Sequence, residues 1–320
     1  MLFQKLFARL VCALIALAVI FFALLFMPVS KNSGSQEFVV QKGSGLSAVA
    51  DELQSEKLIR SSFVFKLIAL ERDRNIKAGT YEISGSQSGF SILNVLLKGP
   101  ETARVVIPEG SSLYDVDDIL AASRVVKPGI FASYALSTSA EGKLFPDTYE
   151  FLVSSDVKDV ADTMMKNYAA KALPVIRESK NSGEELIIAS LLEKEVRSFE
   201  DRKIVAGIIK KRLAAAMPIQ IDATICYAKR VARATGGASS CYPLTPLDFR
   251  FPSPYNTYLN RGLPPGPIGS PGVDALQAAL NAENSPYWYY LSDPVSGKTI
   301  FAKTLDEQSS NRARYLDVSQ

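Results

Sequence analysis

The spacing of hydrophobic residues changes several times along the chain, and the first long run, residues 10–29, is apolar. Residues 10–29 contain no charged side chain, and at about 1.5 Å per residue such a helix is long enough to cross a hydrocarbon core of about 30 Å. Lys5 and Arg9 precede this run, which places a short tail, residues 1–9, in the cytoplasm and the chain beyond the run outside it. No small-x-small cleavage site follows. The pattern predicts an uncleaved, single-pass transmembrane helix.

Two segments of similar pattern come after a polar, Ser/Gly-containing linker at residues 30–36. Residues 39–53 and 106–120 align with each other, with Val, Gly, Ser, Leu, Val, Asp and Leu at equivalent positions. Each copy predicts a short strand, a Gly/Ser turn that caps a helix, and an amphipathic helix. Strand–turn–helix units are common, so the sequence alone leaves open whether the two copies are related.

The residues between the two copies complete a small module. Residues 76–83 have the pattern of a strand that contains a glycine, and residues 90–97 have that of a helix. We therefore expect an α+β chain, with one small α+β module over residues 37–100 and a second small α+β segment over residues 101–155.

The remaining part, residues 156–320, begins with helical periodicity. An apolar stripe over residues 157–172 predicts one helix, and a second, opened by Ser182 with Glu185 three residues later, is expected to continue to about Leu213. Beyond it, short apolar runs alternate with Pro, Gly, Asn and Tyr, a composition that lines surfaces and grooves. We expect a mixed α/β domain with a long glutamate-bearing helix.

Composition narrows the chemistry that such a chain can perform. The 320 residues include no histidine, which excludes Ser/His/Asp triads, Cys/His pairs and His-based zinc sites. With 36 basic and 33 acidic residues, the charge is too balanced for a nucleic-acid-binding surface. Neither clusters of metal ligands nor phosphate-binding glycine loops occur in the sequence, so no metal and no cofactor are expected.

Cysteine usage agrees with an exported domain. Cys12 lies in the predicted membrane span, and Cys226 and Cys241 are the remaining pair. Outside the cytoplasm such a pair can form a disulfide. Spacing alone does not establish the geometry of a bridge, so two separate thiols remain an alternative.

Two glutamates interrupt the apolar pattern of the long helix. Glu195 is three or four residues from Leu191, Leu192 and Phe199, so it shares their helix face. Apolar neighbours disfavour an ionised carboxyl, and a general acid must keep its proton near neutral pH. Glu193 precedes Arg197 by four residues, the spacing of a surface ion pair that keeps a carboxylate ionised. The periodicity alone leaves open that both are ordinary solvated side chains.

Three later segments have the composition of a carbohydrate-binding groove. Residues 220–227 alternate polar and apolar side chains, as in a strand or a strand-to-helix turn. Residues 255–258 and 262–267 combine tyrosines, amides and hydroxyls with a stiff Pro/Gly backbone, a mixture suited to the apolar faces and many hydroxyls of sugars. An irregular structural loop is the alternative.

The order and spacing of these motifs resemble those of the endolytic murein transglycosylase family, the membrane-anchored YceG-like proteins. The motifs are Glu193-Lys194-Glu195, Gln220-x-Asp222-x-Thr224-x-x-Tyr227, Tyr255-Asn256-Thr257-Tyr258 and Gly262-Leu263-Pro264-Pro265-Gly266-Pro267-Ile268. Residues 76–81, 145–149 and 271–272 extend the resemblance over nearly the whole exported part. The resemblance implies a bacterial inner-membrane protein with a LysM-like module at residues 37–100 and a periplasmic catalytic domain at residues 156–320.

The resemblance also implies the reaction. Glu195 corresponds to the family's catalytic residue, which protonates the glycosidic oxygen between N-acetylmuramic acid and N-acetylglucosamine and then accepts the proton of the muramyl C6 hydroxyl. The product is a 1,6-anhydromuramyl end, which terminates elongation of a nascent glycan strand. Nascent peptidoglycan strands and the membrane are the implied partners, and cell-wall synthases are a candidate class of which the sequence singles out none. The residues expected to bind substrate are Gln220, Asp222, Thr224, Tyr255, Asn256 and Glu193.

The sequence departs from the family pattern near its C-terminus. Thr299 and Gln308 stand where histidines are common in the family, which argues against a required role of those histidines in bond cleavage, since Glu195 is retained. Two alternatives remain open from the sequence. One is a hydrolytic muramidase in which Asp222 activates water, and the other is a membrane-tethered peptidoglycan-binding scaffold without catalysis.

Overall fold

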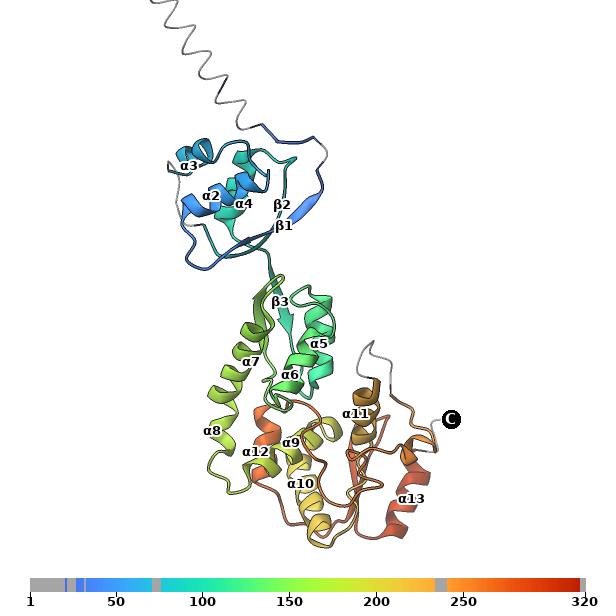
Figure 1. Ribbon diagram of the computed structural model, residues 1–320. Helices are drawn as coiled ribbons and strands as arrows, with labels where there is room; N and C mark the ends of the chain where they lie inside the picture. Colours follow the sequence, from blue (N-terminus) through green and yellow to red (C-terminus); the bar gives the residue numbers. More distant parts are fainter. Residues whose placement is uncertain (1–20, 22–26, 32, 71–75, 234–240, 317–320) are drawn as a thin grey trace, which may run out of the picture. The chain divides into compact units, whose positions relative to one another are not determined.

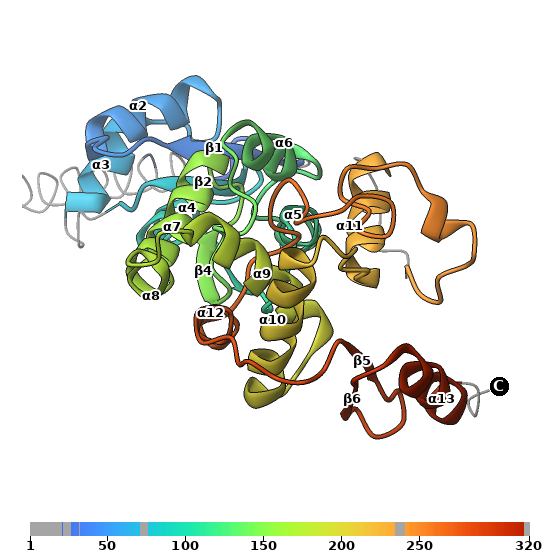
Figure 2. The same ribbon diagram turned by 90° about the horizontal axis from the view of Figure 1, so that it is seen from below.

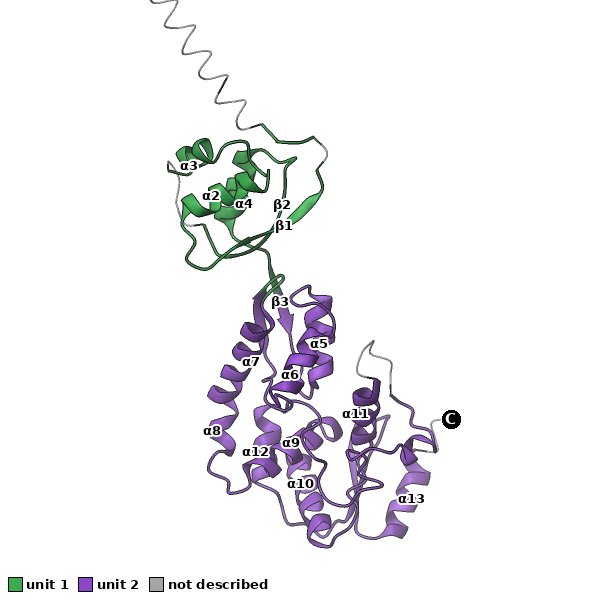
Figure 3. Cartoon of the chain, viewed as in Figure 1, with its two compact units in different colours: residues 1–103, 152–155 green, residues 104–151, 156–320 purple. Residues whose placement is uncertain are grey.

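The computed structural model describes residues 21, 27–31, 33–70, 76–233 and 241–316. The chain has a mixed α+β fold and divides into two compact units (Figure 3). Unit 1 comprises residues 1–103 with 152–155, and unit 2 comprises residues 104–151 with 156–320. Most of the expected second segment, residues 101–155, thus groups with the residues that follow it. The predicted transmembrane helix, residues 10–29, lies almost entirely outside the described residues, and none of the helices within them is both long and apolar enough to span a bilayer.

Unit 1 is built on a two-stranded antiparallel sheet with helices around it (Figure 1). Its elements are β1 (Ser35–Val40), α2 (Leu46–Ser55), α3 (Ser62–Leu70), β2 (Gly79–Ser84) and α4 (Gly89–Lys98). Phe38 of β1 lies opposite Tyr81 of β2, and both side chains join Leu53, Phe65 and Leu96 in one buried cluster. Alternation along the strands and helical spacing along α2–α4 therefore direct side chains from every element into a single core.

Unit 2 opens with the second strand–turn–helix copy. Its first elements are β3 (Thr102–Val106), α5 (Leu113–Ala122), α6 (Ile130–Ser137), β4 (Thr148–Leu152), α7 (Val157–Lys171) and α8 (Leu173–Ile176). The predicted strand, turn and helix are confirmed in both copies, but their caps differ. Ser112 and Asp115 form a capping box at the start of α5, whereas Gly45 precedes α2 and contributes no side-chain bond.

The rest of unit 2 surrounds the candidate site. Its elements are α9 (Ser182–Glu195), α10 (Phe199–Ala214), α11 (Asp222–Arg233), the short 3₁₀ helix η1 (Asp248–Arg250), α12 (Val273–Leu280), β5 (Tyr289–Ser292), β6 (Thr299–Ala302) and α13 (Leu305–Tyr315). Helices α9, α10 and α12 pack on one another (Figure 2). Strands β5 and β6 pair antiparallel, and α13 packs on both.

The prediction of one helix from Ser182 to about Leu213 is wrong. α9 ends at Glu195, Val196 adopts an extended conformation, and Ser198 caps α10 by accepting a hydrogen bond from the Asp201 N–H. A serine with its side chain bonded to the new helix favours a restart, although apolar periodicity continues across the break. The break places Glu195 at a helix end, where its side chain can reach groups from other elements.

For residues 220–227, the structure decides between the two alternatives of a strand and a strand-to-helix turn. Gln220 adopts a left-handed conformation (φ 55°), and α11 begins two residues later at Asp222. The segment is therefore a turn into a helix rather than a strand.

Candidate active site

A pocket of about 690 Å³ in unit 2 contains Glu195. This volume lies in the range of small-molecule sites. Its walls come from the end of α9, from α10, from the turn before α11, from residues 242–258, from β5 and from α13. The lining residues that carry the chemistry are Glu195, Asp222, Arg212, Tyr242, Tyr258 and Tyr290. Acidic, basic and aromatic side chains thus face one space.

Glu195 is partly buried in the wall of this pocket. Its Oε2 accepts a hydrogen bond from the Tyr290 hydroxyl (3.4 Å), and its main-chain oxygen accepts one from Ser292 (3.2 Å). Burial, followed by the negative charge of Asp222, raises the pKa of Glu195 to about 7, against the opposing hydrogen bonds from the Ala223 N–H and Tyr290. Burial is the cause expected from the sequence. A substantial fraction of Glu195 therefore holds a proton at neutral pH.

Asp222 faces the same pocket from the first turn of α11. Its Oδ1 accepts a hydrogen bond of 2.5 Å from the Tyr258 hydroxyl, and the ring of Tyr258 packs edge-on against Phe249, with 4.9 Å between ring centroids. Burial and the adjacent Asp222 raise the pKa of Tyr258, so its hydroxyl remains a donor. The pocket thus holds two carboxyl groups in different environments, the usual basis for dividing acid and charge-stabilising roles.

Arg212 of α10 holds two walls of the pocket together. Its Nε donates to the Trp288 carbonyl (2.9 Å) and its Nη1 donates to the Ile219 carbonyl (2.8 Å). The guanidinium also lies 5.2 Å from the centroid of the Tyr289 ring. The sequence analysis identified neither Arg212 nor Tyr290, because their partners lie 76 and 95 positions away along the chain, and no local pattern marks such a contact.

Gln220 lines the pocket and precedes a buried threonine pair that supports it. The Thr257 hydroxyl accepts the Ile221 N–H (3.0 Å), and the Thr224 hydroxyl donates to the Ile221 carbonyl (2.6 Å). The two hydroxyls lie 3.0 Å apart. Thr224, expected to bind substrate, is thus fully buried behind the turn, where it holds the backbone between Gln220 and α11.

Two other expected substrate-binding residues, Asn256 and Tyr255, do not line the pocket. The side-chain amide of Asn256 is buried, donates to the carbonyls of Phe249 and Phe251 (3.2 and 2.9 Å) and accepts the Tyr258 N–H (3.0 Å). The ring of Tyr255 packs against Tyr227, with 4.7 Å between centroids. Neither residue is part of the described pocket lining. Asn256 shapes the loop that presents Tyr258.

Glu193 forms a buried ion pair instead of the expected surface pair with Arg197, so that prediction is wrong. Its Oε1 pairs with Arg202, and its Oε2 accepts the Gly272 N–H (2.9 Å). The break after α9 removes Arg197 from the helix and so prevents the expected pairing. Burial raises the pKa of Glu193, while the Gly272 N–H and Arg202 act in the opposite direction. Glu193 therefore anchors α9 to α10 and α12 rather than facing the pocket.

The positions that depart from the family's histidines lie near Glu195. Gln308 of α13 lines the pocket and donates to the Tyr290 carbonyl (3.0 Å). Thr299 of β6 pairs with Ser292 of β5. Both residues therefore help to place the strand that carries Tyr290.

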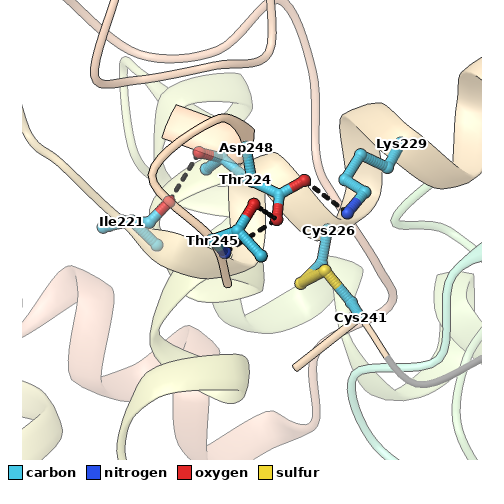
Figure 4. The surroundings of a disulfide bond; sticks show 7 residues. All are labelled: Ile221, Thr224, Cys226, Lys229, Cys241, Thr245 and Asp248. Atoms are coloured by element: carbon cyan, nitrogen blue, oxygen red, sulfur yellow. Dashed lines mark hydrogen bonds and ion pairs between the residues drawn. A yellow bond between two sulfur atoms is a disulfide. The ribbon is translucent and has the colours of Figure 1, made fainter. Parts of the chain in front are cut away.

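Cys226 of α11 and Cys241 form a disulfide, with 5.6 Å between their Cα atoms (Figure 4). The structure thus selects the bridge from the two alternatives that the sequence left open. Within the described ranges, no group of three or more Asp, Glu, Cys or His side chains is arranged to hold a metal ion.

Comparison with known proteins identifies relatives over most of the chain. The chain is 28% identical to an endolytic murein transglycosylase of Streptococcus pneumoniae over 335 residues, covering 91% of this chain and 60% of that protein. It is 27% identical to an endolytic murein transglycosylase of Bacillus subtilis, covering 90% of this chain and 87% of that protein. The chain therefore spans about three fifths of the length of the pneumococcal relative.

A solved structure supports the same relationship. The crystal structure of a YceG-like protein from Listeria monocytogenes matches with a TM-score of 0.54 and 29% identity, covering 88% of this chain and all of the other. The sequence profile of the YceG-like family matches residues 38–314, which cover parts of both compact units and include every pocket residue named above. This chain therefore belongs to the YceG-like family.

Proposed function

We propose that this protein is an endolytic lytic transglycosylase that cleaves peptidoglycan glycan strands between N-acetylmuramic acid and N-acetylglucosamine. The observation that carries this proposal is the carboxyl of Glu195, whose pKa is raised to about 7, in a pocket that also contains Asp222 and several tyrosines. The names of the pneumococcal and Bacillus relatives support it. A protonated acid at a sugar-sized pocket is what cleavage of an acetal requires.

Glu195 acts first as the general acid. It donates its proton to the glycosidic oxygen while the bond from that oxygen to C1 of the muramyl residue breaks, and positive charge develops on the sugar ring. The carboxylate of Asp222, held by the Tyr258 hydroxyl, offsets this charge. The ionised Glu195 then keeps its hydrogen bonds from Tyr290 and the Ala223 N–H, which stabilise the negative carboxylate.

The same carboxylate acts next as the general base. The C6 hydroxyl of the muramyl residue attacks C1 and transfers its proton to Glu195, which regenerates the acid and leaves a 1,6-anhydromuramyl end. Enzymes that hydrolyse glycosidic bonds generally need a second carboxyl to attack or to activate water. Here the substrate supplies its own nucleophile, so one acid/base group completes the cycle without consuming water.

The location and the domain roles belong to the same proposal. The uncharged run at residues 10–29 supports a single-pass anchor in the bacterial inner membrane, with the chain that follows it in the periplasm. The Cys226–Cys241 disulfide supports an oxidising compartment. Unit 1, a small α+β unit with its own hydrophobic core, is proposed as a LysM-like glycan-binding module. Nascent strands made by cell-wall synthases are the proposed substrate.

The chemical identity of the product end tests the reaction. The full-length protein in detergent is incubated with purified peptidoglycan, and released fragments are analysed by mass spectrometry. We expect 1,6-anhydromuramyl ends from the wild type and from Glu184→Gln, an exposed glutamate in the first turn of the same helix. Glu195→Gln should abolish them. Anhydromuramyl ends at the wild-type rate from Glu195→Gln would refute the assignment.

A second candidate is a hydrolytic muramidase, which the presence of Asp222 beside Glu195 favours. In that reaction Asp222 would activate a water molecule. Reducing muramyl ends that incorporate ¹⁸O from labelled water would support hydrolysis, whereas anhydro ends without ¹⁸O would exclude it.

A further inference from the structure

Residues 241–250, here called the strap, are attached to α11 at two points (Figure 4). At one end the disulfide joins Cys241 to Cys226. Nearer the other end, Asp248 forms an ion pair of 2.6 Å with Lys229 of α11. Asp248 also accepts hydrogen bonds from the main-chain N–H and the hydroxyl of Thr245, both at 2.8 Å. A segment rich in proline and without regular strand structure is thereby fixed along one helix.

The strap contributes two aromatic residues to the pocket that contains Glu195. Phe249 and Tyr242 both line this pocket, but their surroundings differ. Phe249 packs against Tyr258 and is only partly exposed. Tyr242 keeps 54% of its surface exposed. The ring of Tyr242 is thus the aromatic surface of the strap that a substrate in the pocket can reach.

Tyr242 lines the same pocket as the two carboxyl groups, Glu195 and Asp222. Burial of the hydroxyl end, followed by the negative charges of Glu195 and Asp222, raises its pKa to about 12. The hydroxyl therefore stays neutral and able to donate throughout the physiological pH range. The aromatic face has a negative potential, which attracts the weakly positive C–H groups on the apolar face of a pyranose.

We propose that Tyr242 forms a sugar-stacking subsite for the peptidoglycan strand and that the Cys226–Cys241 disulfide holds it in place, so that glycan binding depends on the redox state of this pair. This inference rests on the proposed function, because it assigns a substrate contact in the same pocket. Tyr242 directly follows Cys241 in the chain, so the disulfide is the nearest attachment of the ring to α11. The attachment through the Lys229–Asp248 ion pair is six residues further along the chain than Tyr242.

A dithiol reagent supplies the two electrons that reduce the Cys226–Cys241 disulfide. Its two thiols reduce the bridge by successive thiol–disulfide exchange, which leaves Cys226 and Cys241 as thiols and the reagent as its own disulfide. Reduction releases one end of the strap but leaves Glu195 and its hydrogen-bond donors, Tyr290 and the Ala223 N–H, unchanged. The expected effect is therefore on substrate binding rather than on the chemical step.

Kinetics on soluble, uncross-linked glycan strands test the subsite in the full-length protein. Tyr242→Ala should raise KM by roughly tenfold, the size expected for one aromatic contact, with kcat nearly unchanged. Tyr242→Phe keeps the ring and should retain most of the affinity. Leu247→Ala is the matched control, because Leu247 lies on the strap, is 77% exposed and is not part of the described pocket lining. An unchanged KM in Tyr242→Ala would overturn the subsite.

Reduction tests the role of the disulfide. Wild type treated with dithiothreitol, with both thiols verified by alkylation and mass spectrometry, should show the raised KM of Tyr242→Ala. The Cys226→Ser/Cys241→Ser variant should show it without reductant and should not respond to dithiothreitol. A KM that does not change on verified reduction would refute the proposed control by the disulfide. Circular dichroism checks that each protein remains folded.

A binding measurement separates this inference from the proposed function. Retention of Glu195→Gln on insoluble peptidoglycan requires no cleavage, and adding Tyr242→Ala to it should weaken retention by a similar factor. If the wild type releases no anhydromuramyl ends but Tyr242→Ala still weakens retention, the proposed reaction fails and the subsite stands. If ends are released but neither retention nor KM responds to Tyr242→Ala, the reaction stands and the subsite fails.

Discussion

Glu195→Gln is expected to stabilise unit 2 at alkaline pH while it removes the acid that cleaves the substrate. The physical reason is the raised pKa of Glu195, which burial and the neighbouring Asp222 bring from 4.5 to about 7. The folded state therefore binds this proton more tightly than the unfolded state does. Stability falls as the pH rises through the interval between the two values, because the carboxyl must ionise in an unfavourable place. Glutamine has no such transition and keeps an oxygen acceptor for Tyr290.

The difference between the two pKa values sets the magnitude. At about 1.4 kcal/mol per pKa unit, the rise of the pKa from 4.5 to about 7 corresponds to about 3 kcal/mol at pH 8 as an upper bound. Glu195 is partly open to the pocket, so solvent reduces this penalty, and we expect a gain of about 1–2 kcal/mol for the variant. Well below pH 4.5, both states of the wild-type residue are largely protonated and the gain should vanish.

Urea unfolding followed by tryptophan fluorescence measures this effect. Trp288 is the single tryptophan of the chain and lies in unit 2, where its carbonyl accepts a hydrogen bond from Arg212. The free energy of unfolding of Glu195→Gln minus that of the wild type should grow between pH 5 and pH 8. A difference that is constant with pH, or that becomes smaller at pH 8, would refute the reasoning.

Glu193→Gln is the matched control two residues away in the same helix. It leaves the guanidinium of Arg202, whose side chain is only 9% exposed, without its charged partner. Loss of one member of a buried ion pair costs about 3 kcal/mol, so this variant should be destabilised at pH 8, the opposite sign to Glu195→Gln. If both substitutions changed the free energy of unfolding by the same amount, the environment of each glutamate would not determine the effect of its substitution.

Four further substitutions test the pocket and the helices that support it. Asp222→Asn removes the negative charge beside Glu195, so the pKa of Glu195 should fall and the alkaline limb of the kcat/KM profile should move to lower pH by up to about one unit; a shift to higher pH would contradict this. Arg212→Lys keeps the charge but not the two-carbonyl geometry, and urea unfolding should show a loss of about 2 kcal/mol, with unchanged stability as the contrary result. Gly207→Ala places a methyl group 1.9 Å from the main-chain oxygen of Glu283 and should destabilise unit 2 by at least about 2 kcal/mol. By contrast, the methyl group of Gly183→Ala meets no atom within 4 Å, so this substitution should stabilise α9 by about 0.5 kcal/mol.

Sequence patterns predicted correctly those features that depend on residues close together along the chain. The strand, turn and helix of both copies follow from alternation and helical spacing within about fifteen residues, and the capping box of Ser112 and Asp115 involves residues three positions apart. Glu195 was identified from its helix face and from a motif of adjacent residues. These predictions depend on neighbours along the chain, so the sequence contains the information directly.

The break between α9 and α10 shows where local pattern fails. Apolar spacing continues through residues 195–199, and it does not distinguish one long helix from two that meet at an angle. Packing of both helices on α12 and the cap of Ser198 select the second. Because of this break, Glu193 pairs with Arg202 and not with Arg197, the partner expected from the sequence.

The sequence by itself thus determined that an acidic group would lie on an apolar helix face of an α+β protein, and its motifs indicated the family. Tertiary structure decided what surrounds that group. Tyr290 reaches Glu195 from 95 positions away, Arg212 joins walls that are distant in the sequence, and Tyr242, which follows the disulfide-bonded Cys241, lines the same pocket. The reason is physical, because the pKa of a buried carboxyl depends on distances and solvent access in space, and these arise only when distant segments pack together.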